Sequence, residues 1–327
     1  MSKIYDKPFK TYSEQLEKIK KEYELQVPDD KLAIEFLKTL SYYNLINAYQ
    51  DKFLTNGKYQ KDINLNLIIF ISIFEKSFLT IIFKYSTYVE EIFKTKLAYT
   101  ISNRLGVDEK EYLKKKNYKV PKCRMSDFYK TQQALKKSLG TNDMPTKHYK
   151  NNHNHIPAWI LFKNTYFNVV IDLFTFLQKD MQDEVIDDYK FLSLVQDNNQ
   201  NKLKSIKRML TTIRKFRNKI AHNAKVSNFK LNHTEYIQYQ WIPEITSLFP
   251  FFEKTDIKNG IGEGDLYSAI FAIFVLLDND ILRKGFLQEI LTILSSEKTI
   301  SDTYIEMCNF PKDILKRIEK IEDNLMN

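Results

Sequence analysis

The chain has 327 residues, of which 43% are hydrophobic, so it can bury a core of ordinary size and is neither a disordered tail nor a small disulfide scaffold. Seven glycines and eight prolines fall far below the roughly 12% that these residues reach in ordinary proteins, and tight sheets need them. The deficit favours an all-α fold, in which 23 phenylalanines and 20 tyrosines supply bulk for packing, and the net charge of +9 suggests an anionic partner.

The N-terminal half begins with a helical segment over about residues 1–60. Its second helix starts near Asp29-Asp30, because carboxylates suit a helix N-terminus, and Asn56-Gly57 marks a turn. Residues 65–105 are apolar nearly all round, which predicts one or two helices in the centre of the fold, ended by Gly106. Residues 107–155 are polar and basic, so we expect a surface excursion with one short helix near residues 128–139.

The second half continues with an apolar helix from Pro157 to Leu177 and a basic helix over about 202–222. Amphipathic helices follow beyond Pro250, and this part is acidic. We therefore expect three parts: an N-terminal segment (1–60), a core (61–250) that carries the excursion, and a C-terminal helical extension (251–327).

Targeting and redox features are few. The charged N-terminus does not look like a signal peptide, and no stretch of 18 uncharged apolar residues exists, so we expect a cytosolic protein without a membrane partner. Cys123 and Cys308 match no zinc or redox spacing. His153 and His155 alternate on the excursion, but no third ligand is evident, so we expect a polar loop there and no metal or other cofactor.

Positive charge concentrates in two segments. Between Asn201 and Lys230 there are ten lysines and arginines and no acidic residue, and the stretch from Arg104 to Lys150 has thirteen cations and five acids. Such fields attract polyanions by counterion release, so RNA is a candidate partner, although a merely solvated helix face would have the same composition. The basic helix carries an apolar stripe through Ile206, Met209, Ile213 and Phe216, which leaves its cations for the other side. The candidate RNA-binding residues are Lys207, Arg208, Arg214, Lys215, Lys219 and Lys225.

The end of this helix carries residues suited to RNA cleavage. Arg217, Asn218 and His222 provide a bidentate cation, an amide and an imidazole, a group that titrates near neutral pH. In cleavage through the 2′-hydroxyl, a base removes the 2′-proton, an acid protonates the leaving 5′-oxygen, and a cation stabilises the phosphorane. No metal is required for this reaction. The six residues alone more often mean a surface cation and a histidine that closes a helix.

The motif has a wider sequence context. It stands in Phe216-Arg217-Asn218-Lys219-Ile220-Ala221-His222-Asn223, and further elements are spread along most of the chain. These elements are Lys7-Pro8-Phe9, Leu40-Ser41-Tyr42-Tyr43-Asn44-Leu45, Val89-Glu90, Pro157-Ala158-Trp159 and Asn309-Phe310-Pro311. In residues and in order, this set resembles the HEPN ribonucleases of the bacterial abortive-infection (Abi-like) family.

The resemblance implies an antiparallel helical bundle with N- and C-terminal extensions and with Arg217 and His222 at a cleft. Glu90 would match a family glutamate that holds one of these residues, although a surface role is open. We expect Tyr42 and Tyr43 to pack in the core and Trp159 to anchor a helix start, with base stacking as the alternative for each.

The resemblance also implies an abortive-infection or toxin-type endoribonuclease that cuts single-stranded or looped RNA. Cleavage needs both a base and an acid, and each chain supplies one such histidine. If both roles fall to histidine, the second must come from another copy of the chain, which predicts a homodimer with the motif helices at its interface. A nuclease of this kind needs restraint, by a small RNA or a protein antitoxin. A non-cleaving RNA-binding module is the alternative, and a scaffold that binds only protein is a third.

Overall fold

The computed structural model describes residues 6–326. Helices make up 71% of it, and the strands are negligible, so the predicted all-α fold is confirmed. The chain forms two compact units, each built from two separate stretches. The first contains the residues up to Thr80 together with Thr292–Lys312, and the second contains Ile81–Leu291 together with the chain from Asp313 onward. The domain limits near residues 60 and 250 stay predictions.

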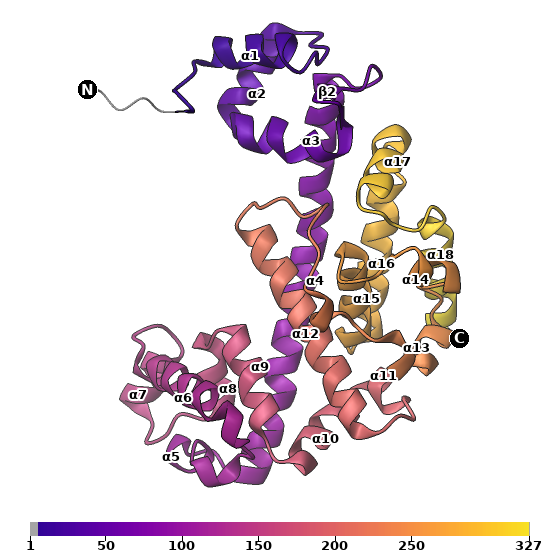
Figure 1. Cartoon of the computed structure of the whole chain (residues 1–327). Coiled ribbons are helices and arrows are strands. Elements are labelled where there is room, and N and C mark those ends of the chain that lie inside the picture. Colours follow the sequence, from indigo (N-terminus) through magenta and orange to yellow (C-terminus); the bar gives the residue numbers. More distant parts are fainter. Residues whose placement is uncertain (1–5, 327) are drawn as a thin grey trace, which may run out of the picture. The chain divides into compact units, whose positions relative to one another are not determined.

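The first unit contains short helices and one hairpin (Figure 1). Its elements are α1 (Tyr12–Lys21), α2 (Asp30–Tyr42), α3 (Ala48–Phe53), β1 (Leu54–Thr55), β2 (Lys58–Tyr59), the beginning of α4 (Leu65–Leu105) and α17 (Lys298–Met307). Asp29 caps α2, as its carboxylate accepts from the amides of Lys31 and Leu32. Asn56 and Gly57 have positive φ angles of 53° and 80°, which two-residue hairpins require, so the predicted turn is confirmed.

The aromatic pair after α2 departs from the prediction. A wide helical turn, Tyr43–Asn47, follows α2 and directs Leu45 and Ile46 into the core. Tyr42 is half-buried, whereas the side chain of Tyr43 is 71% exposed. The expectation that both tyrosines pack in the core was therefore wrong for Tyr43, because the helix is broken at Ser41, which has a φ of 65°, and the turn after it buries Leu45 and Ile46 instead.

α4 is one continuous helix of 41 residues, within the range of one or two helices expected for this segment. By length and composition it could span a membrane, yet 56% of its most apolar 18-residue window is buried inside the protein. In the first unit, α4 carries the buried carboxylate of Glu75. This carboxylate accepts a hydrogen bond of 2.7 Å from the Tyr49 hydroxyl. Burial of this kind fits a core helix of a folded protein.

The second unit is built around α12. Its elements are the rest of α4, α5 (Glu109–Tyr112), α6 (Met125–Gly140), α7 (Thr146–Asn152), α8 (Ala158–Leu161), α9 (Phe167–Phe176), α10 (Lys179–Asp187), α11 (Lys190–Ser193), α12 (Asn199–Ala221), α13 (Pro243–Leu248), α14 (Lys254–Lys258), α15 (Leu266–Leu276), α16 (Asp280–Leu294) and α18 (Ile314–Met326). α12 packs against α9, α10 and α15 (Figure 1). Every residue of α15 is buried. The predicted apolar stripe of the basic helix is buried at Ile206, Met209, Ile213 and Phe216.

Two local predictions in this unit need correction. The expected helix from Pro157 to Leu177 is interrupted between α8 and α9, where Thr165 has an extended backbone and its hydroxyl bonds to the Leu161 carbonyl. The side chain thereby satisfies a carbonyl at the end of the first helix, which favours the break. The excursion has the expected helix, α6, and also the short helices α5 and α7, which its polar sequence did not reveal.

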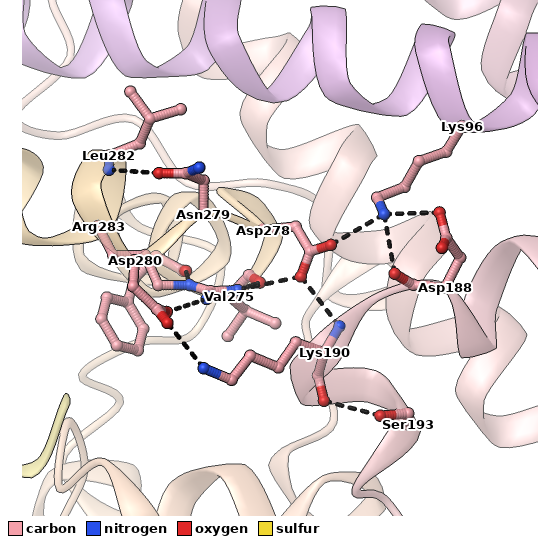
Figure 2. Close-up of polar contacts among 11 residues, drawn as sticks. Lys96, Asp188, Lys190, Ser193, Val275, Asp278, Asn279, Asp280, Leu282 and Arg283 are labelled. Atoms are coloured by element: carbon pink, nitrogen blue, oxygen red, sulfur yellow. Dashed lines mark hydrogen bonds and ion pairs between the residues drawn. The ribbon is translucent and has the colours of Figure 1, made fainter. Parts of the chain in front are cut away.

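An ionic cluster around the buried Arg283 joins several elements of the second unit (Figure 2). Arg283 is fully buried, stacks 3.8 Å from the Phe191 ring centre and donates to the Phe274 carbonyl and to Asp280. Asp278 lies 2.9 Å from the amine of Lys96 on α4. Burial lowers the pKa of Arg283, and its bonds to the two aspartates partly offset this effect. The cluster fixes α4 and α16 within the unit that holds the candidate site.

Candidate active site around Arg217

The helix α12 ends within the motif that runs from Arg217 to His222. Asn198 caps the beginning of the helix, and His222 is its last-turn cap, with its amide donating to the Asn218 carbonyl at 3.1 Å. Asn223 follows in the left-handed conformation, with φ of 52°, and the Ala224 amide bonds back to the Lys219 carbonyl. An asparagine in this conformation is a common helix ending. The chain therefore leaves the helix directly after the imidazole.

Arg217 is held from two sides. Its Nη2 donates to Glu90 Oε2 of α4 at 2.5 Å, and its Nη1 donates to the Asn218 side-chain oxygen at 3.1 Å. The Arg217 side chain is 30% exposed, and its buried Nε has no hydrogen-bond partner. A guanidinium has five N–H donors, so these two contacts leave donors that a ligand oxygen can use.

Glu90 links Arg217 to a second cation. Its other carboxylate oxygen, Oε1, lies 2.7 Å from the amine of Lys94, one turn further along α4. That amine also donates to the Thr165 carbonyl at 2.8 Å, in the break between α8 and α9. The Glu90 side chain is only 13% exposed, so the structure places it as a partly buried bridge and not as a surface residue. α4, α12 and the α8–α9 connection are thus joined at Arg217.

A pocket of about 520 Å³ lies beside this bridge. Its lining combines charged and apolar side chains, among them Glu90, Lys94 and Arg217 together with Trp159 and Lys163. The amine of Lys163 pairs with Glu91 at 2.7 Å, and both side chains are more than half exposed. Three cations thus face two carboxylates around the pocket, and a flat indole lies next to them.

His222 is placed differently from Arg217. It is exposed at the end of α12 and is not among the residues that line the pocket. The structure therefore brings together Arg217, Asn218 and Glu90, and leaves His222 at the solvent one turn beyond Asn218. The sequence reasoning missed the roles of Lys94 and Lys163 at the pocket. The spacing of four between Glu90 and Lys94 was the one available signal, because such pairs share a helix face.

Three of the six predicted RNA-binding cations on and just after α12 are held by contacts within the protein. Lys215 pairs with Glu235 at 2.6 Å, Lys219 lies 4.2 Å from the Phe229 ring centre, and Arg208 stacks over Trp241 at 5.0 Å. Arg214 and Lys225 are half-buried. These side chains do not form the open basic face that the sequence suggested, because other segments pack over that side of the helix.

Burial also changes the charge properties of two of these cations. Desolvation lowers the pKa of Arg208. Desolvation and the repulsion of Arg124 both lower the pKa of Lys207. Asp172 and Asp127 partly offset the shift at Lys207. Lys207 thus faces another cation and two acids within the protein.

The excursion has the exposed positive charge. Its exposed lysines are Lys110, Lys114, Lys115, Lys116, Lys119, Lys122, Lys130, Lys136, Lys137, Lys147 and Lys150. His153 lies 4.5 Å from the Tyr149 ring centre, and its neighbour His155 contacts the Asn154 side chain. Among the described residues, no group of three His, Cys, Asp or Glu side chains is arranged to hold a metal ion. Pro145, in this excursion, borders the pocket.

Comparison with known proteins identifies a family for this chain. A family described as Abi-like protein matches residues 35–228, which is more than half of the chain. The matched range contains Glu90, Trp159, Arg217 and His222, whereas the elements at Lys7–Phe9 and Asn309–Pro311 lie outside it. No curated protein and no solved structure matches significantly.

Proposed function

The chain belongs to the Abi-like protein family of abortive infection, and from this premise we propose that it is a metal-independent endoribonuclease that cuts single-stranded or looped RNA. The observation that carries the proposal is Arg217, a partly exposed guanidinium with donors left over, held by Glu90 beside a pocket of nucleotide size. Unstacked RNA can bring its 2′-oxygen in line with the scissile phosphorus, which a helix forbids.

The proposed reaction is an internal transesterification. A base takes the 2′-hydroxyl proton, the 2′-oxygen forms a bond to phosphorus, and the bond from phosphorus to the 5′-oxygen breaks as an acid protonates that oxygen. The products are a 2′,3′-cyclic phosphate and a 5′-hydroxyl. Arg217, supported by Asn218, stabilises the negative charge of the phosphorane, and His222 carries out a proton transfer. Exposure of His222 allows it to reach a bound RNA.

The second proton-transfer group is proposed to come from another copy of the chain. One chain has a single His222, and its position at the exposed end of α12 allows two copies to meet across a two-fold axis. Sedimentation at micromolar concentration tests this homodimer, and a fully active monomer would contradict it. The toxin-type activity is proposed to act in the cytosol, under restraint by a small RNA or a protein antitoxin.

The decisive experiment measures cleavage of end-labelled single-stranded RNA in EDTA. We expect Arg217→Ala and His222→Ala to lower the rate by roughly 10²- to 10⁴-fold, because each removes a charge-stabilising or proton-transfer group. His153→Ala is the matched control, since this histidine is on the excursion, and it should cut normally. The fragments should end in 2′,3′-cyclic phosphates. Cleavage by His222→Ala at the wild-type rate would exclude the proposed mechanism.

A non-cleaving RNA-binding module is the second candidate. It is favoured by one observation, namely that His222 does not line the pocket with Arg217. In that case Arg217 contacts phosphate only, and both wild type and His222→Ala bind RNA without cutting it. A protein scaffold, in contrast, would show little salt-dependent affinity for RNA.

A further inference from the structure

We propose that the pocket beside Arg217 receives one unstacked nucleobase of the RNA, which stacks on Trp159 while an adjoining phosphate binds Arg217. The inference rests on the proposed function and adds how the substrate is held next to the cut. It assigns to Trp159 the contact with the base, and therefore a preference for RNA with free, unpaired bases near the cleavage site.

The position of Trp159 supports this role. Pro157 and Ala158 are buried and anchor the start of α8, so the helix start does not depend on the indole. Trp159 itself is 45% exposed and lines the pocket, in place of the anchoring role expected from the sequence. A large aromatic face left in water gains free energy when a flat partner covers it.

The surroundings of the indole fit a nucleotide. Ile160 and Phe162 add apolar surface to the pocket, and Lys163 and Arg217 place cations at it. A volume of about 520 Å³ lies within the range of small-ligand sites. Single-stranded nucleic acid is bound by this combination, in which aromatic side chains take the bases and cations take the backbone.

The charge balance favours an anionic occupant over an apolar peptide. Lys163 pairs with Glu91 at the surface, where both side chains are more than half exposed, and such pairs open at little cost. Opening that pair provides an amine for a phosphate beside Trp159. Pro145 of the excursion also lines the pocket, and Lys147 and Lys150 follow it in the chain as exposed lysines.

The chain offers a spectroscopic test, because it contains only two tryptophans, Trp159 and Trp241. In a Trp241→Phe variant, all tryptophan fluorescence comes from Trp159. Titration with a short single-stranded 2′-O-methyl RNA, which lacks the attacking hydroxyl, should quench this fluorescence through stacking. An oligonucleotide of equal length without bases should bind by its phosphates and leave the fluorescence unchanged.

Kinetics supply the second readout. Trp159→Ala should raise KM for single-stranded RNA by roughly 5- to 100-fold with a smaller change in kcat, the range that loss of one stacked base produces. Trp159→Phe should restore most of the affinity, and thermal unfolding of both variants verifies their fold.

The outcomes separate this inference from the proposed function. Quenching by the 2′-O-methyl RNA, with no cleavage of unmodified single-stranded RNA of the same sequence, would support the pocket and contradict the nuclease. Cleavage without quenching, and with an unchanged KM in Trp159→Ala, would overturn the pocket and leave the nuclease standing. Equal quenching of the Trp159 fluorescence by the oligonucleotide without bases would also overturn base stacking. Quenching by an apolar peptide and not by the RNA would overturn it as well.

Discussion

The basic helix α12 and the basic excursion (107–155) look alike in sequence and differ in structure. α12 has the denser charge, yet its cations are half-buried, paired or stacked, as Lys215 with Glu235 and Arg208 over Trp241 show. In the excursion, lysines such as Lys116 and Lys122 extend into solvent. The amount of positive charge in a segment therefore does not determine how much of it a polyanion can reach.

The difference follows from packing. α12 has an apolar stripe that lies against α9, α10 and α15, and Glu235 of the segment that follows it pairs with Lys215. α6, the longest helix of the excursion, has only Phe128, Thr131 and Leu135 buried, and its lysines are all exposed. We infer that α12 positions Arg217 and that the excursion attracts RNA, and this division can be tested at several points.

The largest expected effect is on RNA affinity. Replacing Lys116, Lys119, Lys122 and Lys130 with Gln should weaken binding of single-stranded RNA by roughly 10²-fold at 0.1 M salt and reduce the salt slope by about 0.7 for each lost phosphate contact. The double variant Lys215→Gln/Lys219→Gln on α12 should leave the slope nearly unchanged. Filter binding over a salt series measures both. Equal losses in the two variants would end the distinction between the segments.

The next effect concerns the bridge at Arg217. Glu90→Gln leaves Arg217 and Lys94 close together without their shared carboxylate, so the free energy of unfolding should fall by about 1–3 kcal/mol. Glu91→Gln removes the neighbouring carboxylate on the same helix, which pairs with Lys163 at the surface, and should cost less than about 0.5 kcal/mol. Urea unfolding of both variants gives the comparison. A similar loss in each would show that the bridge has no special strength.

The sequence predicted the parts of this arrangement that depend on local pattern. The apolar period of α12 identified its buried stripe, and the family resemblance identified Glu90 as a partner of the motif. The pairs Lys215–Glu235 and Lys163–Glu91 could not be predicted, because they join residues of different elements that only tertiary packing brings together. The same holds for the exposure of Tyr43 and Trp159, because burial of a side chain depends on which other elements pack against it.

A smaller effect is expected where α12 pairs with a loop. Lys215→Met removes the cation that binds Glu235, whose side chain is 25% exposed. The unfolding free energy should fall by about 1 kcal/mol, since a half-buried pair lies between surface and core values. Lys137→Met on the excursion, an exposed lysine, is the matched control and should change stability by less than about 0.5 kcal/mol. Equal losses of unfolding free energy in the two variants would mean that this lysine of α12 is as exposed to solvent as those of the excursion.

The smallest effect lies where the two segments meet, at Asp172 of α9. Burial raises the pKa of its carboxyl from the ordinary 3.8, although Lys207 of α12 and Arg124 of the excursion act in the opposite direction. The folded protein thus holds this proton more tightly than the unfolded chain does. The resulting stabilisation is complete below about pH 3.8 and is lost as the pH rises through the raised pKa of the folded state.

Asp172→Asn cannot titrate, so its stability relative to wild type should increase as the pH rises from about 3 to 7. Denaturant unfolding of both proteins across this range measures the difference, and Asp127→Asn controls for removal of an exposed carboxylate near the same cations. If the variant instead lost stability relative to wild type as the pH rose, attraction by Lys207 and Arg124 would outweigh burial. The cations of α12 would then act at full strength at this boundary, and the contrast with the excursion would be one of degree.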